Sequence, residues 1–188
     1  MSDLLLLALL LGEPKHGYAL KKLAAFITGQ RDLHNNVLYP ALRKFVNEGW
    51  VSSRSVAGNR GQTRVLYSLS AKGKAELLRR LAEFGPKEIV SLEAFRLRVG
   101  LFDLLDADSR VRILAARKTW NNAREKRLLD LQTRIKTMGA TDWGQESAEF
   151  ALTLVRLEQE WITRLERKTQ LASRAKPFSK ASLKRRSA

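Results

Sequence analysis

The fold of the first part of this chain is predicted by the stretch NNVLYPALRKF, residues 35–45. Leu38, Leu42 and Phe45 are spaced four and three residues apart, which places them on one inward stripe of a helix. Gly49 follows as a glycine suited to the end of that helix. The stretch therefore predicts a short amphipathic helix that packs by its leucines and phenylalanine and presents polar residues on its other side.

Short elements on both sides of this helix complete a pattern of three helices and a hairpin. Residues 4–11 and 16–27 predict two apolar helices. Residues 50–56 and 64–69 are rich in residues that favour strands, and the glycines of residues 57–63 predict a turn between them. This is the winged form of the helix-turn-helix, whose third helix lies in a DNA major groove. For the second helix we expect an inward face of Tyr18, Leu20, Leu23, Ala24 and Ile27.

Beyond the hairpin the pattern is helical only. Residues 70–84 and 91–105 predict two further helices, with Gly85-Pro86 as the domain boundary. The predicted fold class is mainly α with one small β-hairpin. We expect a winged helix-turn-helix domain at residues 1–85, a helical domain for dimerisation and effector binding at 86–174, and a basic disordered tail at 175–188.

Two long helices, separated by Gly139, predict a homodimer. Both are amphipathic, and a single hairpin of helices cannot cover both apolar stripes by itself. A second copy of the chain would cover them, most simply in an isologous, coiled-coil-like interface. The residues expected at this interface are Leu128, Leu131, Ile135, Leu154, Leu157, Trp161 and Leu165.

Two interpretations are open for Asn121, and two others for the three tryptophans of this region. Asn121 falls at a seven-residue spacing with Leu114, Leu128 and Ile135, which is typical of a polar residue that fixes register in a helix seam, but another stripe competes with this frame. Trp120, Trp143 and Trp161 suit either a ligand pocket or, as is commoner for large aromatics on such helices, core and dimer contacts.

Composition points to a polyanionic partner. The chain has 35 basic and 19 acidic residues, giving a net charge of +16, which attracts nucleic acid or an acidic membrane surface. The longest apolar run has eight residues, far fewer than the ~20 of a membrane span. There is no cysteine and only His16 and His34 as histidines, so we expect no metal, no cofactor and no enzyme activity. A soluble, cytoplasmic protein that does not bind membranes is expected.

The outward face of the helix over residues 35–45 suits double-stranded DNA. Asparagine reads adenine, arginine reads guanine, and a tyrosine hydroxyl binds phosphate. Without the hairpin beside it, the same face would be an ordinary solvated surface capped by asparagines. The residues expected to bind DNA here are Asn35 and Asn36, either of which suits the N-cap, with Tyr39, Pro40, Arg43 and Asn47.

Basic residues outside this helix extend the expected DNA contacts. Arg60 lies at the tip of the hairpin, with Arg54 and Arg64 on the flanking strands, where such side chains enter a minor groove or bind phosphate. Lys15, Lys21 and Lys22 lie near the second helix, which crosses the DNA backbone in this motif. Each of these charges also fits a merely solvated surface.

Several motifs resemble the PadR family of transcriptional regulators. They are His16-Gly17-Tyr18, then LYPAL at residues 38–42, Glu48-Gly49, and YSLS at residues 67–70 followed by Gly73. The family has a threonine where this chain has Ser70. The resemblance implies a dimeric cytoplasmic transcription factor, usually a repressor, that binds a near-palindromic operator. It also implies, as in some relatives, release of DNA when a small aromatic effector binds.

Two other classes of function remain open at this stage. A non-specific architectural nucleic-acid binder would share the high charge and the basic tail, but would bind any duplex equally. A helical protein–protein adaptor would keep the fold while Arg43 and Arg60 became expendable. An enzyme is the weakest alternative, since no catalytic motif is recognisable in the sequence.

Overall fold

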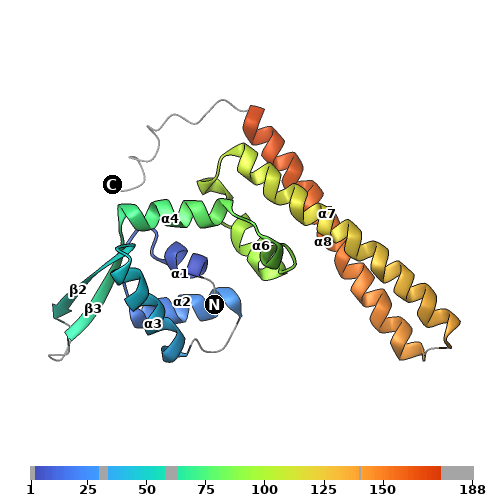
Figure 1. Ribbon diagram of the computed structural model, residues 1–188, viewed down its shortest axis with the longest axis horizontal. Coiled ribbons are helices and arrows are strands. Elements are labelled where there is room, and N and C mark those ends of the chain that lie inside the picture. The colour runs from blue at the N-terminus through green and yellow to red at the C-terminus, as the bar shows by residue number, and fades with distance from the viewer. Residues whose placement is uncertain (1–2, 30–33, 58–62, 140, 175–188) are drawn as a thin grey trace. The chain divides into compact units, whose positions relative to one another are not determined.

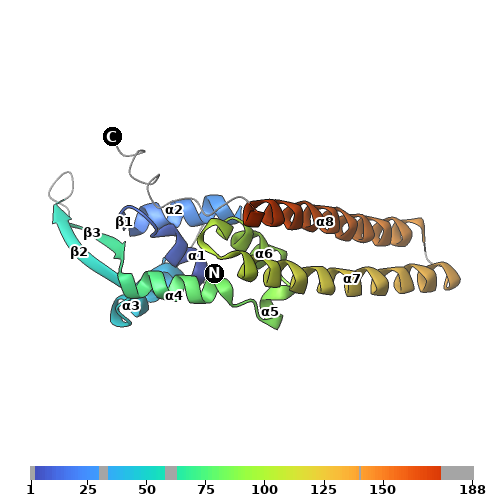
Figure 2. The same cartoon turned by 90° about the horizontal axis from the view of Figure 1, so that it is seen from above.

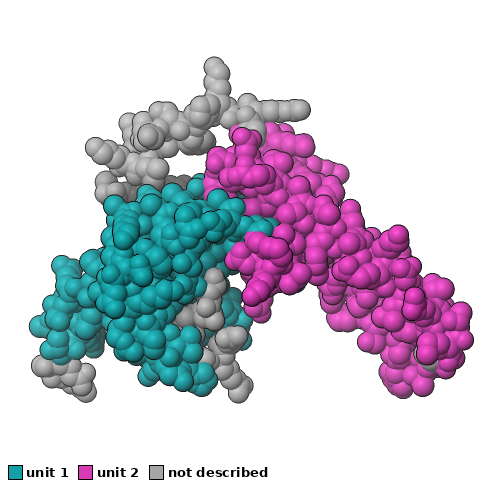
Figure 3. Space-filling view, in the orientation of Figure 1, with its two compact units in different colours: residues 1–84, 96–104 teal, residues 85–95, 105–188 magenta. Residues whose placement is uncertain are grey.

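The computed structural model describes residues 3–29, 34–57, 63–139 and 141–174. Their contacts divide the chain into two compact units (Figure 3). Unit 1 comprises residues 1–84 together with 96–104, and unit 2 comprises residues 85–95 together with 105–188. The division at Gly85 falls at the Gly-Pro pair, and residues 96–104, which the sequence assigns to the helical domain, cluster with unit 1.

Unit 1 is a winged helix-turn-helix domain (Figure 1). Its sheet is antiparallel, with the order β1-β3-β2. Leucines from α1, α2, α3 and α4 form the core, together with Phe45 of α3. The elements are α1 (Asp3–Leu9), β1 (Lys15–His16), α2 (Gly17–Thr28), α3 (Asn35–Asn47), β2 (Val51–Ala57), β3 (Thr63–Leu69) and α4 (Ala71–Ala82).

Two features of unit 1 differ from the sequence prediction. The two-residue strand β1 makes the sheet three-stranded, and such a short strand has no periodicity to detect. On α2, only Leu20 and Ala24 of the expected inward face are buried, whereas Tyr18, Leu23 and Ile27 are exposed. The prediction was wrong for these three residues because the surrounding helices cover only a narrow stripe of α2. This stripe contains Leu20, Ala24 and the buried Gly17, the first residue of the helix.

The base of the hairpin is fixed to the first turn of α4. The hydroxyl of Ser70 caps this helix by accepting a hydrogen bond from the Gly73 amide (2.9 Å) and donates one to the Gly49 carbonyl (2.7 Å). A Cβ on Gly73 would lie only 2.0 Å from the Trp50 carbonyl oxygen. The backbone of α4 therefore meets that of Trp50, the residue before β2, so closely that only glycine fits, and serine performs the capping role expected of threonine.

Unit 2 is built on a hairpin of two long helices, α7 (Ala107–Thr137) and α8 (Asp142–Arg174), which lie side by side (Figures 1 and 2). The helices are antiparallel, since Lys118 pairs with Glu166 and Glu125 with Arg156. The short helix α5 (Pro86–Ile89) packs against α7. Helix α6 (Leu92–Val99) ends before Gly100, earlier than the sequence predicted, and the turn η2 (Phe102–Leu104) follows it.

A buried ion pair joins α7 to α8 inside unit 2. Arg117 is 0% exposed and donates to both carboxylate oxygens of Glu158, with distances of 2.6 and 3.0 Å. Its guanidinium also donates to the Ile89 carbonyl and stacks on the Trp120 ring at 4.4 Å. Asn121, one turn further along α7, is fully buried, and neither polar atom of its amide has a partner among the residues described.

No helix in the described part of the chain combines the length and apolar character needed to cross a membrane.

Candidate nucleic-acid interface

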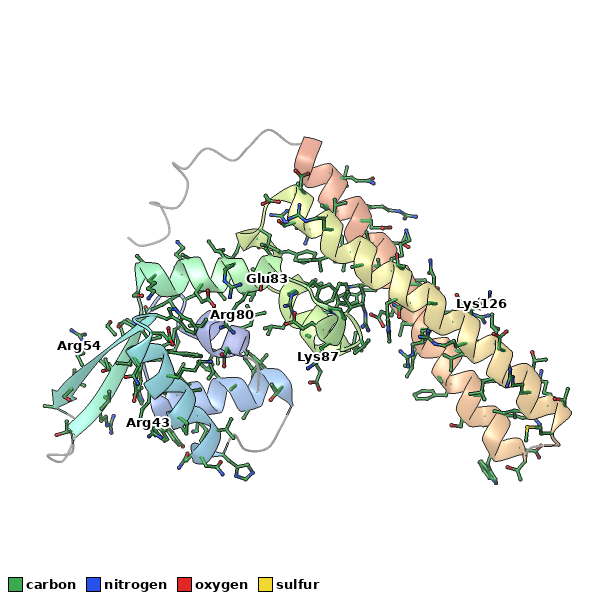
Figure 4. The ribbon with its side chains drawn as sticks, viewed as in Figure 1. Arg43, Arg54, Arg80, Glu83, Lys87 and Lys126 are labelled. Carbon is green, nitrogen blue, oxygen red and sulfur yellow. The ribbon has the colours of Figure 1, made fainter. Side chains whose placement is uncertain are left out.

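The third helix has the two faces that its sequence predicts. Leu38, Leu42 and Phe45 are 0% exposed, which confirms the inward stripe. The opposite face is exposed, and Figure 4 shows Arg43 on this side of the domain. All the expected contact residues of the helix lie on exposed positions: Asn35, Asn36, Tyr39, Pro40, Arg43 and Asn47.

The start of this helix corrects one detail of the prediction. The N-cap is His34, which makes no side-chain cap, so Asn35 and Asn36 are the first two helical residues. Pro40 is then the sixth residue and lies inside the helix rather than in its first turn. Because proline has no N–H, the Asn36 carbonyl lacks the amide partner four residues on.

Tyr39 of this helix lies against the first residue of α2. A Cβ built on Gly17 would lie 2.9 Å from Cε1 of Tyr39 and 3.0 Å from its hydroxyl oxygen. The glycine of the His-Gly-Tyr motif thus makes room for the tyrosine of the Tyr-Pro motif. Tyr39 itself is 38% exposed, so its ring is held on one side and accessible on the other.

Tyr67 of β3 was not among the residues predicted to bind DNA, but two residues of α3 influence its pKa. Burial and the nearby Tyr39 raise the pKa of the Tyr67 phenol, and the positive charge of Arg43 opposes that rise. Tyr67 is opposite Lys15 on one side of the sheet and opposite Ser53 on the other. Its membership of the YSLS motif was a signal that could have pointed to it.

The hairpin presents two arginines on one of its faces. Arg54 of β2 is opposite Leu66, and Arg64 of β3 is opposite Val56, so the register places both arginines on the same side of the hairpin. Both are exposed and have no hydrogen-bond or ion-pair partner within the residues described, and Figure 4 shows Arg54 on the hairpin. Arg60, expected at the tip, lies outside the described residues.

The lysines of unit 1 are partly engaged within the protein. Lys15 Nζ donates to the Glu13 carbonyl at 3.1 Å, and Lys22 Nζ lies 4.8 Å from the centre of the Tyr18 ring. Lys21 is half-buried. The exposed Lys44 of α3 was not among the residues predicted to bind DNA. It forms an ion pair with Asp3 at 3.0 Å.

Helix α8 has two apolar faces, and two of the expected dimer residues, Leu154 and Leu157, lie on the one that α7 does not cover. The covered face contains Leu152, Val155 and Ile162, which are at most 6% exposed. On the outer face Leu154 is 44% and Leu157 is 57% exposed. Of the other residues expected at the interface, Leu131 is exposed, whereas Leu128, Ile135, Trp161 and Leu165 are half-buried.

The tryptophans proposed as an alternative ligand pocket do not share one environment. Trp161 packs edge-on against Phe95 with ring centres 5.3 Å apart, and Trp120 stacks on Arg117. Trp143 is 84% exposed and lies on α8. Trp161 and Trp120 therefore contribute to the packing of unit 2. Asn121 faces the interior, as its seven-residue spacing with Leu114 suggests.

Three helices followed by a two-stranded wing, with a polar exposed third helix, define the winged helix-turn-helix class of DNA-binding domains. Residues 6–79 match the model of the "Transcriptional regulator PadR-like family". Residues 6–79 are thus similar to the PadR family of transcriptional regulators, as the motifs of this part of the chain suggest. No curated protein matches the chain.

Solved structures similar to the chain include Bacillus subtilis PadR and a protein of Streptococcus mutans. PadR in complex with operator DNA is 19% identical, with a TM-score of 0.43, over 89% of this chain and 96% of that chain. PadR in complex with p-coumaric acid is 19% identical, with a TM-score of 0.37, over 89% and 98%. The protein smu.1604c of Streptococcus mutans UA159 is 20% identical, with a TM-score of 0.40, over 87% and 97%.

Proposed function

We propose that this chain acts as a homodimeric repressor that binds a near-palindromic DNA operator. Each subunit would place α3 in a major groove and the arginines of the hairpin on the flanking DNA. The observation that carries the proposal is the exposed face of α3, where two asparagines, a tyrosine and an arginine lie together on a well-packed helix. These side chains match the hydrogen-bonding edges of adenine and guanine.

Dimerisation through the outer face of α8 is the second part of the proposal. The apolar residues Trp143, Phe150, Leu154, Leu157 and Trp161 follow the alternating spacing of three and four residues that coiled coils use, apart from one seven-residue step. Trp143, Phe150, Leu154 and Leu157 of this stripe are exposed and need a partner surface, whereas Trp161 is half-buried against Phe95. A second copy of the same helix is the partner that a closed two-fold dimer supplies.

Charge favours an antiparallel arrangement of the two α8 helices. The stripe continues into Arg164 and Lys168, and a parallel, in-register pair would bring each of these charges against its own copy. An antiparallel pair centred between Leu154 and Leu157 instead sets Lys168 opposite Trp143 and Arg167 near Glu146 of the second copy. Both contacts are then attractive, the first as a cation–π pair and the second as an ion pair.

The dimer is tested by placing charge on the outer face of α8. Leu157→Glu buries a carboxylate in the proposed interface, whereas Arg156→Glu, its neighbour in sequence, changes an exposed residue that pairs within the chain. We expect sedimentation velocity to show a dimer for the native chain and for Arg156→Glu, and a monomer for Leu157→Glu. A dimeric Leu157→Glu variant would contradict the assignment of this face.

The family resemblance extends the proposal to repression in the cytoplasm and to release of DNA by a small aromatic effector. An effector that shifts α7 against α8 would alter half-site spacing and thereby DNA affinity. Titration of phenolic acids into the protein–DNA complex tests this part.

The experiment for the whole proposal is selection of preferred duplexes from a random-sequence pool by the full-length protein. We expect enrichment of an inverted repeat with half-sites about 10 bp apart, the spacing of one helical turn. Enrichment without any preferred sequence would favour the non-specific architectural binder. Failure to retain duplex DNA even at low salt would favour the helical adaptor.

A further inference from the structure

Gly17, the first residue of α2, is a glycine that its own backbone does not require. It is buried, and its φ lies outside the left-handed region that favours glycine. An alanine could adopt the same conformation and would favour the helix more than glycine does. The reason for the missing side chain therefore lies in a neighbouring group.

That group is the ring of Tyr39, on the exposed face of α3. A Cβ on Gly17 would lie 2.9 Å from Cε1 of Tyr39, 3.0 Å from its hydroxyl oxygen and 3.2 Å from its Cζ. These three atoms form the outer end of the ring, so the end that carries the hydroxyl rests on the start of α2. Tyr39 is 38% exposed, and its hydroxyl has no hydrogen-bond partner among the residues that the structure describes.

The backbone on which the ring rests is itself fixed by the sheet. His16, the residue before Gly17, is both the last residue of β1 and the N-cap of α2. It is opposite Leu66 of β3 in the antiparallel sheet. The position of the Tyr39 hydroxyl is therefore set by two elements outside α3, the sheet and the first turn of α2.

The contact at Gly17 differs in kind from the one at Gly73. A Cβ on Gly73 would meet a backbone carbonyl, whereas a Cβ on Gly17 would meet only the far end of a side chain. A tyrosine side chain can turn to another rotamer, and one side of Tyr39 is open to solvent. A methyl group at position 17 should therefore displace the Tyr39 hydroxyl while the fold is retained.

We propose that Gly17 is a positioning residue for DNA binding, which holds the Tyr39 ring against the start of α2 so that its hydroxyl meets a phosphate of the DNA backbone. This inference rests on the proposed function, since it concerns how α3 is seated on DNA. A tyrosine hydroxyl donates to phosphate oxygens, and such contacts fix the register of a protein on the duplex without reading its sequence. A buried glycine that does not touch DNA then contributes to affinity.

The test is a comparison of affinities for the duplex enriched from the random pool. The proteins are native, Gly17→Ala, Tyr39→Phe, Tyr39→Ala and the double variant Gly17→Ala with Tyr39→Ala. We expect Gly17→Ala and Tyr39→Phe each to lose about tenfold, the effect of one hydrogen bond to a charged group. The loss should be equal on duplexes with single base-pair changes, because a phosphate contact carries no sequence information.

The double variant separates displacement of the ring from other effects of the methyl group. Once Tyr39 is alanine, no ring remains to be displaced, so Gly17→Ala should cause no further loss of affinity. Thermal unfolding is measured for every variant. If Gly17→Ala alone lowers the melting temperature, the double variant should recover it, and its affinity relative to Tyr39→Ala still tests the role.

Gly85→Ala supplies the matched control. A Cβ at that position would meet no atom within 4 Å, and its φ of −79° suits any residue. We expect this variant to bind the enriched duplex with native affinity.

Three outcomes would overturn the inference. Native affinity in Gly17→Ala or in Tyr39→Phe would mean that the hydroxyl is not positioned for a DNA contact. A further loss on adding Gly17→Ala to Tyr39→Ala would mean that Gly17 acts by another route. A loss confined to one base pair would mean that Tyr39 reads a base instead of binding phosphate. Failure of the proposed function is distinct from all three, because the native protein would then enrich no sequence at all.

Discussion

Replacement of Glu158 by glutamine should strongly destabilise unit 2. The substitution keeps the size of the side chain but removes the negative charge that faces Arg117. Arg117 is 0% exposed and Glu158 is 7% exposed, so water cannot replace the lost partner. Breaking one half of such a buried pair typically costs 3–5 kcal/mol. Glutamine retains an acceptor, so we expect a loss of about 3 kcal/mol in the free energy of unfolding.

The assay is equilibrium unfolding followed by tryptophan fluorescence. Three of the four tryptophans, Trp120, Trp143 and Trp161, lie in α7 and α8, so the signal reports mainly on this unit. A loss of about 3 kcal/mol corresponds to a fall in melting temperature of at least about 6 °C. Replacing both partners, as in Arg117→Met with Glu158→Leu, should recover most of the loss because no unpaired charge remains.

The matched control is Glu166→Gln, which breaks a second pair that joins the same two helices. Lys118 and Glu166 are 2.8 Å apart, but their side chains are 45% and 28% exposed. Solvent screening limits such a pair to less than about 1 kcal/mol. Equal effects of Glu158→Gln and Glu166→Gln would refute the argument that burial sets the strength of the Arg117–Glu158 pair.

Three further predictions concern other close contacts. Gly73→Ala should lower the stability of unit 1 by more than about 2 kcal/mol, because its Cβ would meet the Trp50 carbonyl at 2.0 Å; native-like denaturant unfolding would contradict this. The arginines next to Glu76 lower the pKa of its carboxyl from 4.5 to about 2. The stabilising effect of this carboxylate is therefore complete above pH 4.5 and is lost as the pH falls through 2. In Glu76→Gln, the stability of unit 1 should depend less on pH between those values, as measured in an acid titration followed by circular dichroism. Asn121→Leu removes a buried amide with no partner and should raise the free energy of unfolding by about 1 kcal/mol, whereas a loss would show that a bound water or a second chain satisfies the amide.

The winged part of the fold could be predicted because its signals are local. Leu38, Leu42 and Phe45 repeat at helical spacing, and the strands on either side of the turn carry strand-forming residues. The exposed face of α3 follows from the buried one, and the helix residues that the sequence predicts to bind DNA lie at exposed positions. Tyr67 lies on β3 rather than on α3, so helical spacing gave no reason to consider it with Tyr39 and Arg43, which influence its pKa.

The apolar residues of two helices were harder to assign. On α2, Tyr18, Leu23 and Ile27 are apolar and stand at suitable positions, but the structure leaves them exposed. The sequence pattern does not show how much of the helix surface its neighbours cover. On α8, the sequence contains two stripes that are both apolar. Which of them faces α7 depends on the buried pair of Glu158 with Arg117, a contact between residues 41 positions apart in sequence.

The most direct test of specific DNA binding is the affinity of the full-length protein for duplex from the upstream region of its own gene, compared with a scrambled duplex over a range of salt concentrations. We predict a preference of at least about 1,000-fold for the native fragment that persists at about 0.15 M salt. The account would be contradicted if binding to the upstream and scrambled duplexes were equal and steeply salt-dependent, and if the sequence selected from the random pool were also bound no better than the scrambled duplex.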